Sequence, residues 1–228
     1  KATGSSAPIS RKSFLTSVGL AVSGATFLSF LYGVTWGKYA YRTERVQVPM
    51  KGLPEGLQGL KVVQISDAHL GSFSNTPRPV LEALESINAL EADLILFTGD
   101  LVNTHANEAE PWIDAFKGLK ARFGKFSILG NHDYADYGPF SKEERTASIA
   151  KLKSIQDRMG FRMLDNAHVV WEKEGDRMVL LGVENWGKGF RQSGDLPKAM
   201  EGSGAEGAFT LLMSHDPTHY ELEIMNDK

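Results

Sequence analysis

Four short apolar segments of strand length recur along the chain, and each is followed directly by polar side chains. The segments are 61–65, 94–97, 126–129 and 209–213. The polar residues that follow them are Ser66-Asp67-Ala68-His69, Thr98-Gly99-Asp100, Gly130-Asn131-His132-Asp133 and Ser214-His215-Asp216-Pro217. Because the carboxyl ends of strands in an α/β sheet meet at one edge, this pattern predicts a site of Asp, Asn and His side chains at that edge.

Apolar residues at helical spacing predict three core-facing helices between and after these strands. The helices are expected at 77–90, 111–123 and 143–159, with Gly160 as the C-terminal cap of the last. Further strands are expected at 161–164, 168–173 and 177–183, the last two joined by residues 174–176. An edge strand is expected at 45–48, and a glycine-rich surface loop at 187–207 with one short helix near 195–200. Together these elements predict an α/β sandwich of two mixed β-sheets flanked by helices.

The N-terminal pattern differs from that of the rest of the chain. Residues 13–37 are 25 consecutive uncharged residues, bracketed by Lys12 and Lys38, and as a helix they would be long enough to cross a bilayer. A membrane anchor is favoured over a cleaved export signal and over an apolar helix packed on the domain. The order Ser10-Arg11-Lys12-Ser13-Phe14-Leu15 resembles a twin-arginine export signal in which Lys replaces the second Arg.

Four segments follow from these patterns. A polar segment covers 1–12, an anchor or signal helix 13–37, a linker with an edge strand 38–59, and a catalytic domain 60–228. Positive charges flank both ends of the apolar helix, so charge asymmetry leaves the orientation open. We expect the protein to lie in a bacterial cell membrane, with its catalytic domain on the extracytoplasmic side.

The amino-acid composition limits the kinds of partner and site that the chain can have. The formal net charge of −3 and the pI near 6.1 provide no basic footprint for nucleic acid. The absence of cysteine excludes disulfides, thiolate catalysis and cysteine-type zinc sites. The oxygen and imidazole donors after the strands suit borderline divalent metals. Nothing in the sequence indicates an oligomeric state.

The motifs are informative through their order and strand context, because Asp-x-His alone is common by chance. Asp67-x-His69, Gly99-Asp100-x-x-Asn103, Gly130-Asn131-His132-Asp133 and His215 resemble the signature of the calcineurin-like metallophosphoesterases. The resemblance covers about residues 46–228 and is nearest to the membrane-attached bacterial branch of that family. It implies hydrolysis of a phosphoester by a hydroxide that two divalent ions activate, with Mn, Fe or Zn as the expected metals.

The resemblance also implies a role for each motif residue. Asp67 and His69 would bind one metal, Asn131 and His215 the second, and Asp100 would bridge both. His132 would be catalytic without binding metal, either stabilising developing charge or protonating the leaving oxygen. Asp133 is the other catalytic candidate: it would orient the site, and a simple turn-capping aspartate is an equally good interpretation.

Two departures from the family pattern matter. The family closes its site with a Gly-His-x-His segment after the strand that precedes His215, and the sequence stops at Lys228 before one. We expect truncation of a longer protein, and the alternative is a membrane-attached relic of the same fold without turnover. The protein-phosphatase members carry an Asp-Arg pair where this chain has Asn103-Thr104. Without that guanidinium fork, a phosphodiester or pyrophosphate is favoured over a dianionic monoester.

Four further residues are candidates for orienting the site or touching substrate: Asn103, His105, Asn185 and Trp186. The alternatives are an exposed loop histidine for His105 and ordinary turn packing for the Asn185-Trp186 pair. His168 and His219 are expected to be structural or solvated. The predicted function is hydrolysis of a phosphoester, with a phosphodiester favoured as substrate and a lipid-linked pyrophosphatase as a further alternative.

Overall fold

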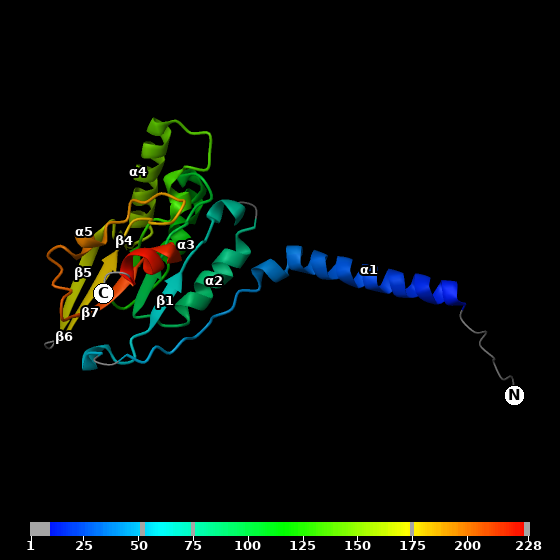
Figure 1. Ribbon diagram of the computed structural model, residues 1–228, viewed down its shortest axis with the longest axis horizontal. Coiled ribbons are helices and arrows are strands. Elements are labelled where there is room, and N and C mark those ends of the chain that lie inside the picture. The colour runs from blue at the N-terminus through cyan, green and yellow to red at the C-terminus, as the bar shows by residue number, and fades with distance from the viewer. Residues whose placement is uncertain (1–9, 51–52, 74–75, 174–175, 226–228) are drawn as a thin grey trace. The chain divides into compact units, whose positions relative to one another are not determined.

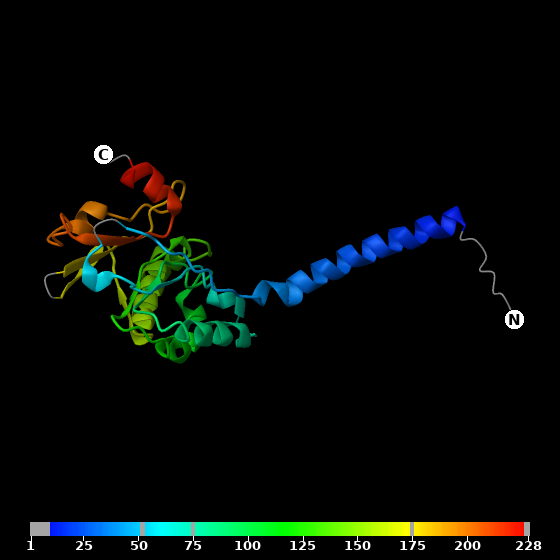
Figure 2. The same cartoon turned by 90° about the horizontal axis from the view of Figure 1, so that it is seen from below.

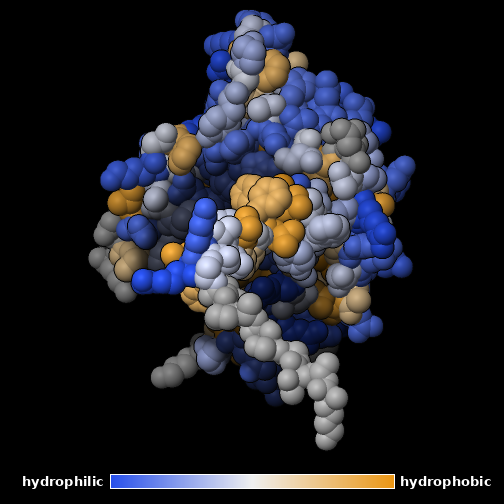
Figure 3. Space-filling view, turned by 90° about the vertical axis from the view of Figure 1, so that its right-hand side faces the viewer, coloured by the Kyte–Doolittle hydropathy of each residue, from blue (hydrophilic) through white to orange (hydrophobic). Residues whose placement is uncertain are grey.

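The computed structural model describes residues 10–50, 53–73, 76–173 and 176–225, and it divides the chain into two compact units after Val48. In the first unit, helix α1 spans Arg11–Thr35 and begins at Ser10, whose hydroxyl accepts a hydrogen bond from the Ser13 N–H at 3.1 Å. None of its residues is buried, and the helix is long and apolar enough to cross a membrane. Figure 3, seen from the side toward which α1 points, shows apolar side chains gathered around the helix.

Hydroxyl groups in the second half of α1 donate to main-chain carbonyls one turn earlier in the helix. The hydroxyl of Thr26 donates to the carbonyl of Val22 at 2.9 Å, and the hydroxyl of Ser29 donates to that of Ala25 at 2.8 Å. Such bonds let hydroxyl groups lie in an apolar surrounding without an unpaired donor.

The predicted edge strand at 45–48 is wrong. These residues form no strand in the described part of the chain, and the side chains of Val46 and Val48 are 80% and 61% exposed. A four-residue alternating segment becomes a strand only where a partner strand and an apolar surface receive it.

Sheet 1 of the second unit contains four strands in the order β1-β2-β3-β4, and all its pairs are parallel. The strands are β1 (Val62–Ile65), β2 (Leu94–Phe97), β3 (Lys125–Ser127) and β4 (Phe161–Met163). Helices α2 (Arg78–Asn88), α3 (Ile113–Lys117) and α4 (Lys142–Arg158) connect them (Figure 1). Since the strands are parallel, the polar segments that follow β1, β2 and β3 all emerge at one edge.

Sheet 2 has the order β5-β6-β7, with β5 antiparallel and β7 parallel to β6. Its strands are β5 (Ala167–Lys173), β6 (Asp176–Gly182) and β7 (Phe209–Met213), and α5 (Leu196–Met200) lies in the loop before β7. After β7 come α6 (Pro217–His219) and a π-helical turn (Tyr220–Ile224). The sandwich of two sheets with helices is confirmed; only sheet 2 mixes strand directions. The expected turn at 174–175 lies outside the described residues.

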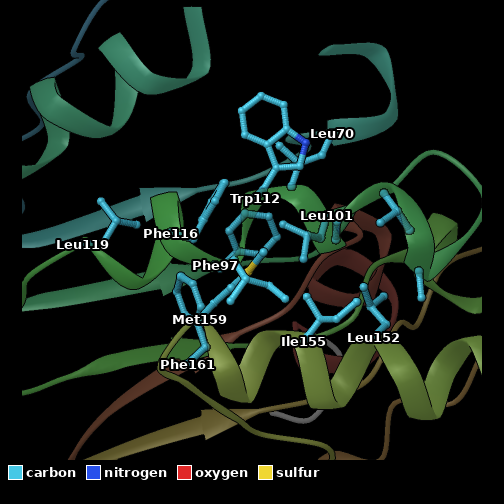
Figure 4. Packing of buried hydrophobic residues seen from close by; sticks show 14 of the residues in the cluster. Leu70, Phe97, Leu101, Trp112, Phe116, Leu119, Leu152, Ile155, Met159 and Phe161 are labelled. Atoms are coloured by element: carbon cyan, nitrogen blue, oxygen red, sulfur yellow. The ribbon is translucent and has the colours of Figure 1, made fainter. Parts of the chain in front are cut away.

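Two apolar cores hold together the helices, sheet 1 and sheet 2. The first lies between sheet 1 and helices α2, α3 and α4, and Figure 4 shows Phe97 at its centre among side chains from these helices. The second lies between the two sheets. Strand β2 contributes Ile95 and Phe97 to the first core and Leu94 and Leu96 to the second, which is why its sequence is uniformly apolar. Figure 2 shows sheet 2 on one side of the unit and helices α2 and α3 on the other.

The predicted helix 111–123 is too long. Helix α3 ends at Lys117, and Gly118 begins the turn that leads into β3. The Phe123 N–H donates to the carbonyl of Asp93 at 2.7 Å, and the Phe123 ring packs on the second core. Backbone bonding at the sheet edge therefore overrides the helical spacing. Helix α4 matches its prediction, with Gly160 at φ +84° after its C-terminus.

Candidate metal centre

The segments that follow β1 and β2 hold three non-glycine residues in left-handed backbone conformations. Asp67, His69 and Asp100 have φ angles of +55°, +42° and +59°. Such angles cost free energy in residues with a Cβ atom and persist where the surrounding structure holds them. Here the Asp67 N–H donates to the Gly99 carbonyl at 3.0 Å, and the His69 N–H donates to the Asp100 carbonyl at 3.1 Å.

Two glycines let the segments after β2 and β3 touch. A Cβ atom on Gly99 would collide with the backbone of Gly130, and one on Gly130 would collide with the Asp100 carboxylate. Gly99 also has φ +106° and lies next to the ring of His215. These glycines bring Asp100 against the segment that carries Asn131.

The Asp100 carboxylate is buried at the centre of the site. Its Oδ2 atom lies 3.7 Å from Nε2 of His69 and 3.5 Å from Nε2 of His215. Nε2 of His69 is also 3.8 Å from Oδ1 of Asp67. These distances exceed those of good hydrogen bonds and are near the spacing of two atoms that each lie about 2.1 Å from one ion.

The donor atoms form two overlapping groups whose members lie within 4.8 Å of one another. One group is His69, Asp100 and His132, and the other is Asp67, Asp100 and His215. Asn131 adds an amide oxygen, since its Oδ1 lies 3.1 Å from Nε2 of His215. Carboxylate, amide oxygen and imidazole nitrogen without thiolate fit divalent metal ions.

Asp100 and His215 stabilise each other's charge. Burial by itself raises the pKa of Asp100, but the polar contact and charge of His215 and the backbone N–H of His132 outweigh it, so this pKa lies below its usual value. Burial lowers the pKa of His215, but the polar contact and charge of Asp100 and the Thr98 carbonyl outweigh it and raise this pKa to about 9. The Thr98 carbonyl accepts from Nδ1 of His215 at 2.8 Å, which leaves Nε2 facing the site.

Asp133 lies beneath these residues and is 1% exposed. Its Oδ2 accepts from the N–H groups of Asp100 at 2.9 Å and Gly130 at 3.0 Å, and its Oδ1 accepts from those of Leu101 at 2.9 Å and Val102 at 3.3 Å. Burial raises the pKa of Asp133 to about 7, and the backbone N–H groups act against this increase. This geometry agrees with the orienting and turn-capping interpretations of Asp133, because the carboxylate holds the Asp100 backbone and does not face the site.

His132 is held in one orientation. Its Nδ1 donates to the Asn103 carbonyl at 2.6 Å, and its ring meets the His69 ring edge-on with centroids 4.8 Å apart. The backbone N–H of His132 donates to Oδ1 of Asp100 at 2.9 Å. Nε2 is therefore the nitrogen left for chemistry.

The site geometry agrees with comparisons to known proteins. The sequence profile described as "Calcineurin-like phosphoesterase" matches residues 60–223. The chain belongs to this family. It is 28% identical over 195 residues to the "Transmembrane protein with metallophosphoesterase domain" of Danio rerio, covering 82% of this chain and 42% of that protein. It is also 28% identical over 217 residues to metallophosphoesterase YkuE of Bacillus subtilis, a match that covers 92% of this chain and 70% of that protein.

A shorter match adds a third relative of this phosphoesterase. Over 83 residues the chain is 40% identical to the "UDP-2,3-diacylglucosamine pyrophosphatase LpxG" of Chlamydia muridarum, covering 36% of this chain and 25% of that protein. The chain thus spans less than half the length of the Danio rerio relative and a quarter of LpxG.

Glu108 is a supporting residue of the phosphoesterase site that the sequence interpretation missed. Its carboxylate accepts from the N–H of Asn103 at 2.6 Å, and from the N–H groups of Thr104 and His105, both at 3.1 Å. It thereby holds the carbonyl that orients His132. A capping-box spacing, with Glu108 three residues after His105, is the signal that could have found it.

Three of the candidate substrate residues have other partners. His105 accepts from the Asn107 N–H at 3.1 Å and packs beside Phe140, as an ordinary loop histidine does. The Nδ2 of Asn185, a fully buried residue, donates to the Arg191 carbonyl at 2.7 Å.

The Trp186 ring lies 5.4 Å from that of His219. The Asn185-Trp186 segment is therefore loop packing beside the segment that carries His215, and the substrate-loop interpretation is not supported. Asn103 does reach the site, through its main-chain carbonyl.

Proposed function

We propose that the protein hydrolyses a phosphoester bond with two divalent metal ions at the carboxyl end of sheet 1. The observation that carries this proposal is the buried carboxylate of Asp100, which lies between Nε2 of His69 and Nε2 of His215 at 3.7 and 3.5 Å. An anion in this position suits a pair of cations, because two close cations repel each other unless a negative group lies between them. Asp67 and His69 would hold one ion, and Asn131 and His215 the other.

When bound, the ions would lower the pKa of an attacking water and offset negative charge on the phosphoryl oxygens. His132 is the proposed general acid. Its Nδ1 hydrogen is committed to the Asn103 carbonyl at 2.6 Å, so in the imidazolium form the proton that can pass to the leaving oxygen is the one on Nε2. Asp133 contributes from below by fixing the backbone of Asp100.

We infer that the substrate is a phosphodiester or a pyrophosphate. The two arginines that contact the turn after Asn131 through Asp136 are already engaged: Arg145 and Arg191 each donate to the Asp136 carboxylate at 3.1 Å. A dianionic monoester is usually recognised by a free guanidinium fork, which these contacts do not offer. A singly charged diester needs less cationic compensation.

A lipid-linked pyrophosphatase is the second candidate. The 83-residue match to LpxG and the long apolar helix α1 favour it. It differs from a phosphodiesterase in the leaving group, which would be a phosphate ester and not an alcohol. Both candidates use the same metal-binding residues.

The test is a substrate panel for the full-length protein loaded with Mn²⁺ in detergent. Bis-p-nitrophenyl phosphate, p-nitrophenyl phosphate and a lipid-linked pyrophosphate represent the three classes. We expect the diester or the lipid pyrophosphate to be cleaved faster than the monoester, and EDTA to abolish all hydrolysis. Hydrolysis that survives complete metal removal, or none on any substrate with Mn²⁺ bound, would contradict the proposal.

We also propose that α1 anchors the protein in a bacterial membrane with the catalytic unit on the extracytoplasmic side. Its length, its apolar surface and the transmembrane relative support this. Resistance to carbonate extraction, together with protease access to the catalytic unit in intact spheroplasts, is the expected result. A mature protein that begins after Gly37 would favour the export-signal alternative.

A further inference from the structure

Tyr137 contacts two residues of the proposed site, although no sequence motif contains it. It lies in the loop between the turn that carries His132 and helix α4, and 49% of its surface is exposed. Its ring stacks on the His132 ring, with centroids 4.2 Å apart and planes 20° from parallel. Its hydroxyl accepts a hydrogen bond from Nδ2 of Asn131 at 2.7 Å.

The contact with Tyr137 fixes which end of the Asn131 side-chain amide faces the site. An asparagine side chain has an oxygen that can bind a cation and a nitrogen that cannot, and the two exchange places when the amide rotates by half a turn. With Nδ2 bound to Tyr137, Oδ1 faces Nε2 of His215 at 3.1 Å, on the side of the metal ligands. Without the hydroxyl, the amide loses the partner that distinguishes its two ends.

The contact with His132 covers one face of its ring. The Asn103 carbonyl fixes the position of Nδ1, but a single hydrogen bond leaves the ring free to tilt about it. Tyr137 on one face and the His69 ring in edge-on contact remove that freedom. The ring, and not the hydroxyl, makes this contact.

The loop that carries Tyr137 is itself held. Asp136 accepts from Nη1 of Arg145 and from Nε of Arg191, both at 3.1 Å, and Nε of Arg145 also donates to the Phe140 carbonyl at 3.1 Å. These bonds tie the loop to α4 and to the segment after β6. The backbone that carries Tyr137 is therefore fixed, and its side chain contacts Asn131 and His132 from a defined position.

We propose that Tyr137 is a positioning residue with two separable effects: its hydroxyl orients Asn131 for metal binding, and its ring orients His132 for turnover. This inference rests on the proposed function. It follows that Tyr137→Phe impairs metal binding alone, whereas Tyr137→Ala impairs metal binding and turnover.

The test is calorimetric titration of full-length metal-free protein with Mn²⁺, together with kcat measured at saturating Mn²⁺. For Tyr137→Phe we expect a roughly tenfold loss of affinity for the weaker Mn²⁺ and an unchanged kcat. For Tyr137→Ala we expect the same loss of affinity and a kcat lowered about tenfold, since His132 is no longer held. Tyr220→Phe, which removes the same atom from an exposed tyrosine, is the matched control and should change neither quantity.

The Asn131→Asp background sharpens the test, because both ends of a carboxylate are oxygen and no orientation needs to be selected. In that background Tyr137→Phe should change Mn²⁺ affinity less than twofold. An equal loss in both backgrounds, or no loss in the Asn131 protein, would overturn the inference while the proposed function stands. If the unsubstituted protein takes up no Mn²⁺, the proposed function itself fails.

Discussion

The two ends of sheet 1 have opposite character, although the same strands connect them. At the carboxyl end, the buried Asp100 carboxylate is 3.5 and 3.7 Å from two imidazoles, and three of the proposed ligand residues have positive φ angles. At the amino end, the Lys125 ammonium group donates to the carbonyls of Met159 at 2.7 Å and Phe116 at 3.0 Å. These carbonyls belong to the last turns of α4 and α3, where a cation is favourable.

The difference shows how the molecule separates function from stability. Main-chain carbonyls accept hydrogen bonds from the half-buried ammonium group at the amino end, so that end is complete without a ligand. At the carboxyl end the charges approach one another without close hydrogen bonds, and the backbone is strained, which is characteristic of a ligand site. Substitutions at the carboxyl end should therefore lower turnover or metal binding, whereas substitutions at the amino end should lower stability.

The largest effect is expected for Asp100→Asn. The substitution keeps the shape of the side chain but removes the charge that two cations would share. Turnover should fall by more than about ten-thousandfold, beyond the upper end of the loss typical of removing a general acid. Steady-state kinetics and bound Mn²⁺ measure it, with Asp114→Asn on the exposed side of α3 as control. Normal turnover would refute the metal assignment.

A smaller catalytic loss is expected for His132→Ala. Removing a general acid typically costs about a hundredfold to ten-thousandfold in rate, and the metal content should stay intact because His132 is not a proposed ligand. Measuring the bound metal together with kcat separates the loss of a general acid from the loss of a metal ion. Loss of bound metal would instead make His132 a ligand, as its grouping with His69 and Asp100 permits.

Asp133→Asn should affect stability more than either substitution above. An amide can accept through one oxygen only, and its nitrogen would face backbone N–H groups that now bond to Oδ2. Leaving buried donors unpaired costs about 1–3 kcal/mol, and the loss should appear as a lower free energy of unfolding in urea. Metal affinity should fall with it. A stability equal to that of the unsubstituted protein would show that the carboxylate is not needed to hold the Asp100 segment.

The smallest effect is expected at the opposite end. Lys125→Met keeps the aliphatic stem of the side chain but removes the hydrogen bonds to the ends of α3 and α4. We expect about 1–2 kcal/mol less stability and unchanged kcat and Mn²⁺ affinity. A catalytic defect at constant stability would erase the contrast between the two ends of the sheet.

The sequence by itself determined the strands of both sheets, most of the helices and the residues that gather at the carboxyl edge. Apolar runs such as 94–97 are buried on both faces, and this property depends on local composition. The family motifs named Asp67, His69, Asp100, Asn131, His132 and His215, and the structure brings all six together. Parallel strands bring together the segments that follow β1, β2 and β3, whereas His215 follows β7 of sheet 2 and reaches the site from the other sheet.

Only the tertiary structure decided how those residues are supported and where the patterns stop. The end of α3, the anchoring of Asn103 by Glu108, the burial of Asp133 beneath Asp100 and the contact of Tyr137 with His132 all depend on particular neighbours. The positive φ angles at Asp67, His69 and Asp100 likewise persist only because backbone bonds between separate segments hold them. Periodicity records which face of an element is buried, whereas contacts between residues distant in sequence decide what each polar group faces.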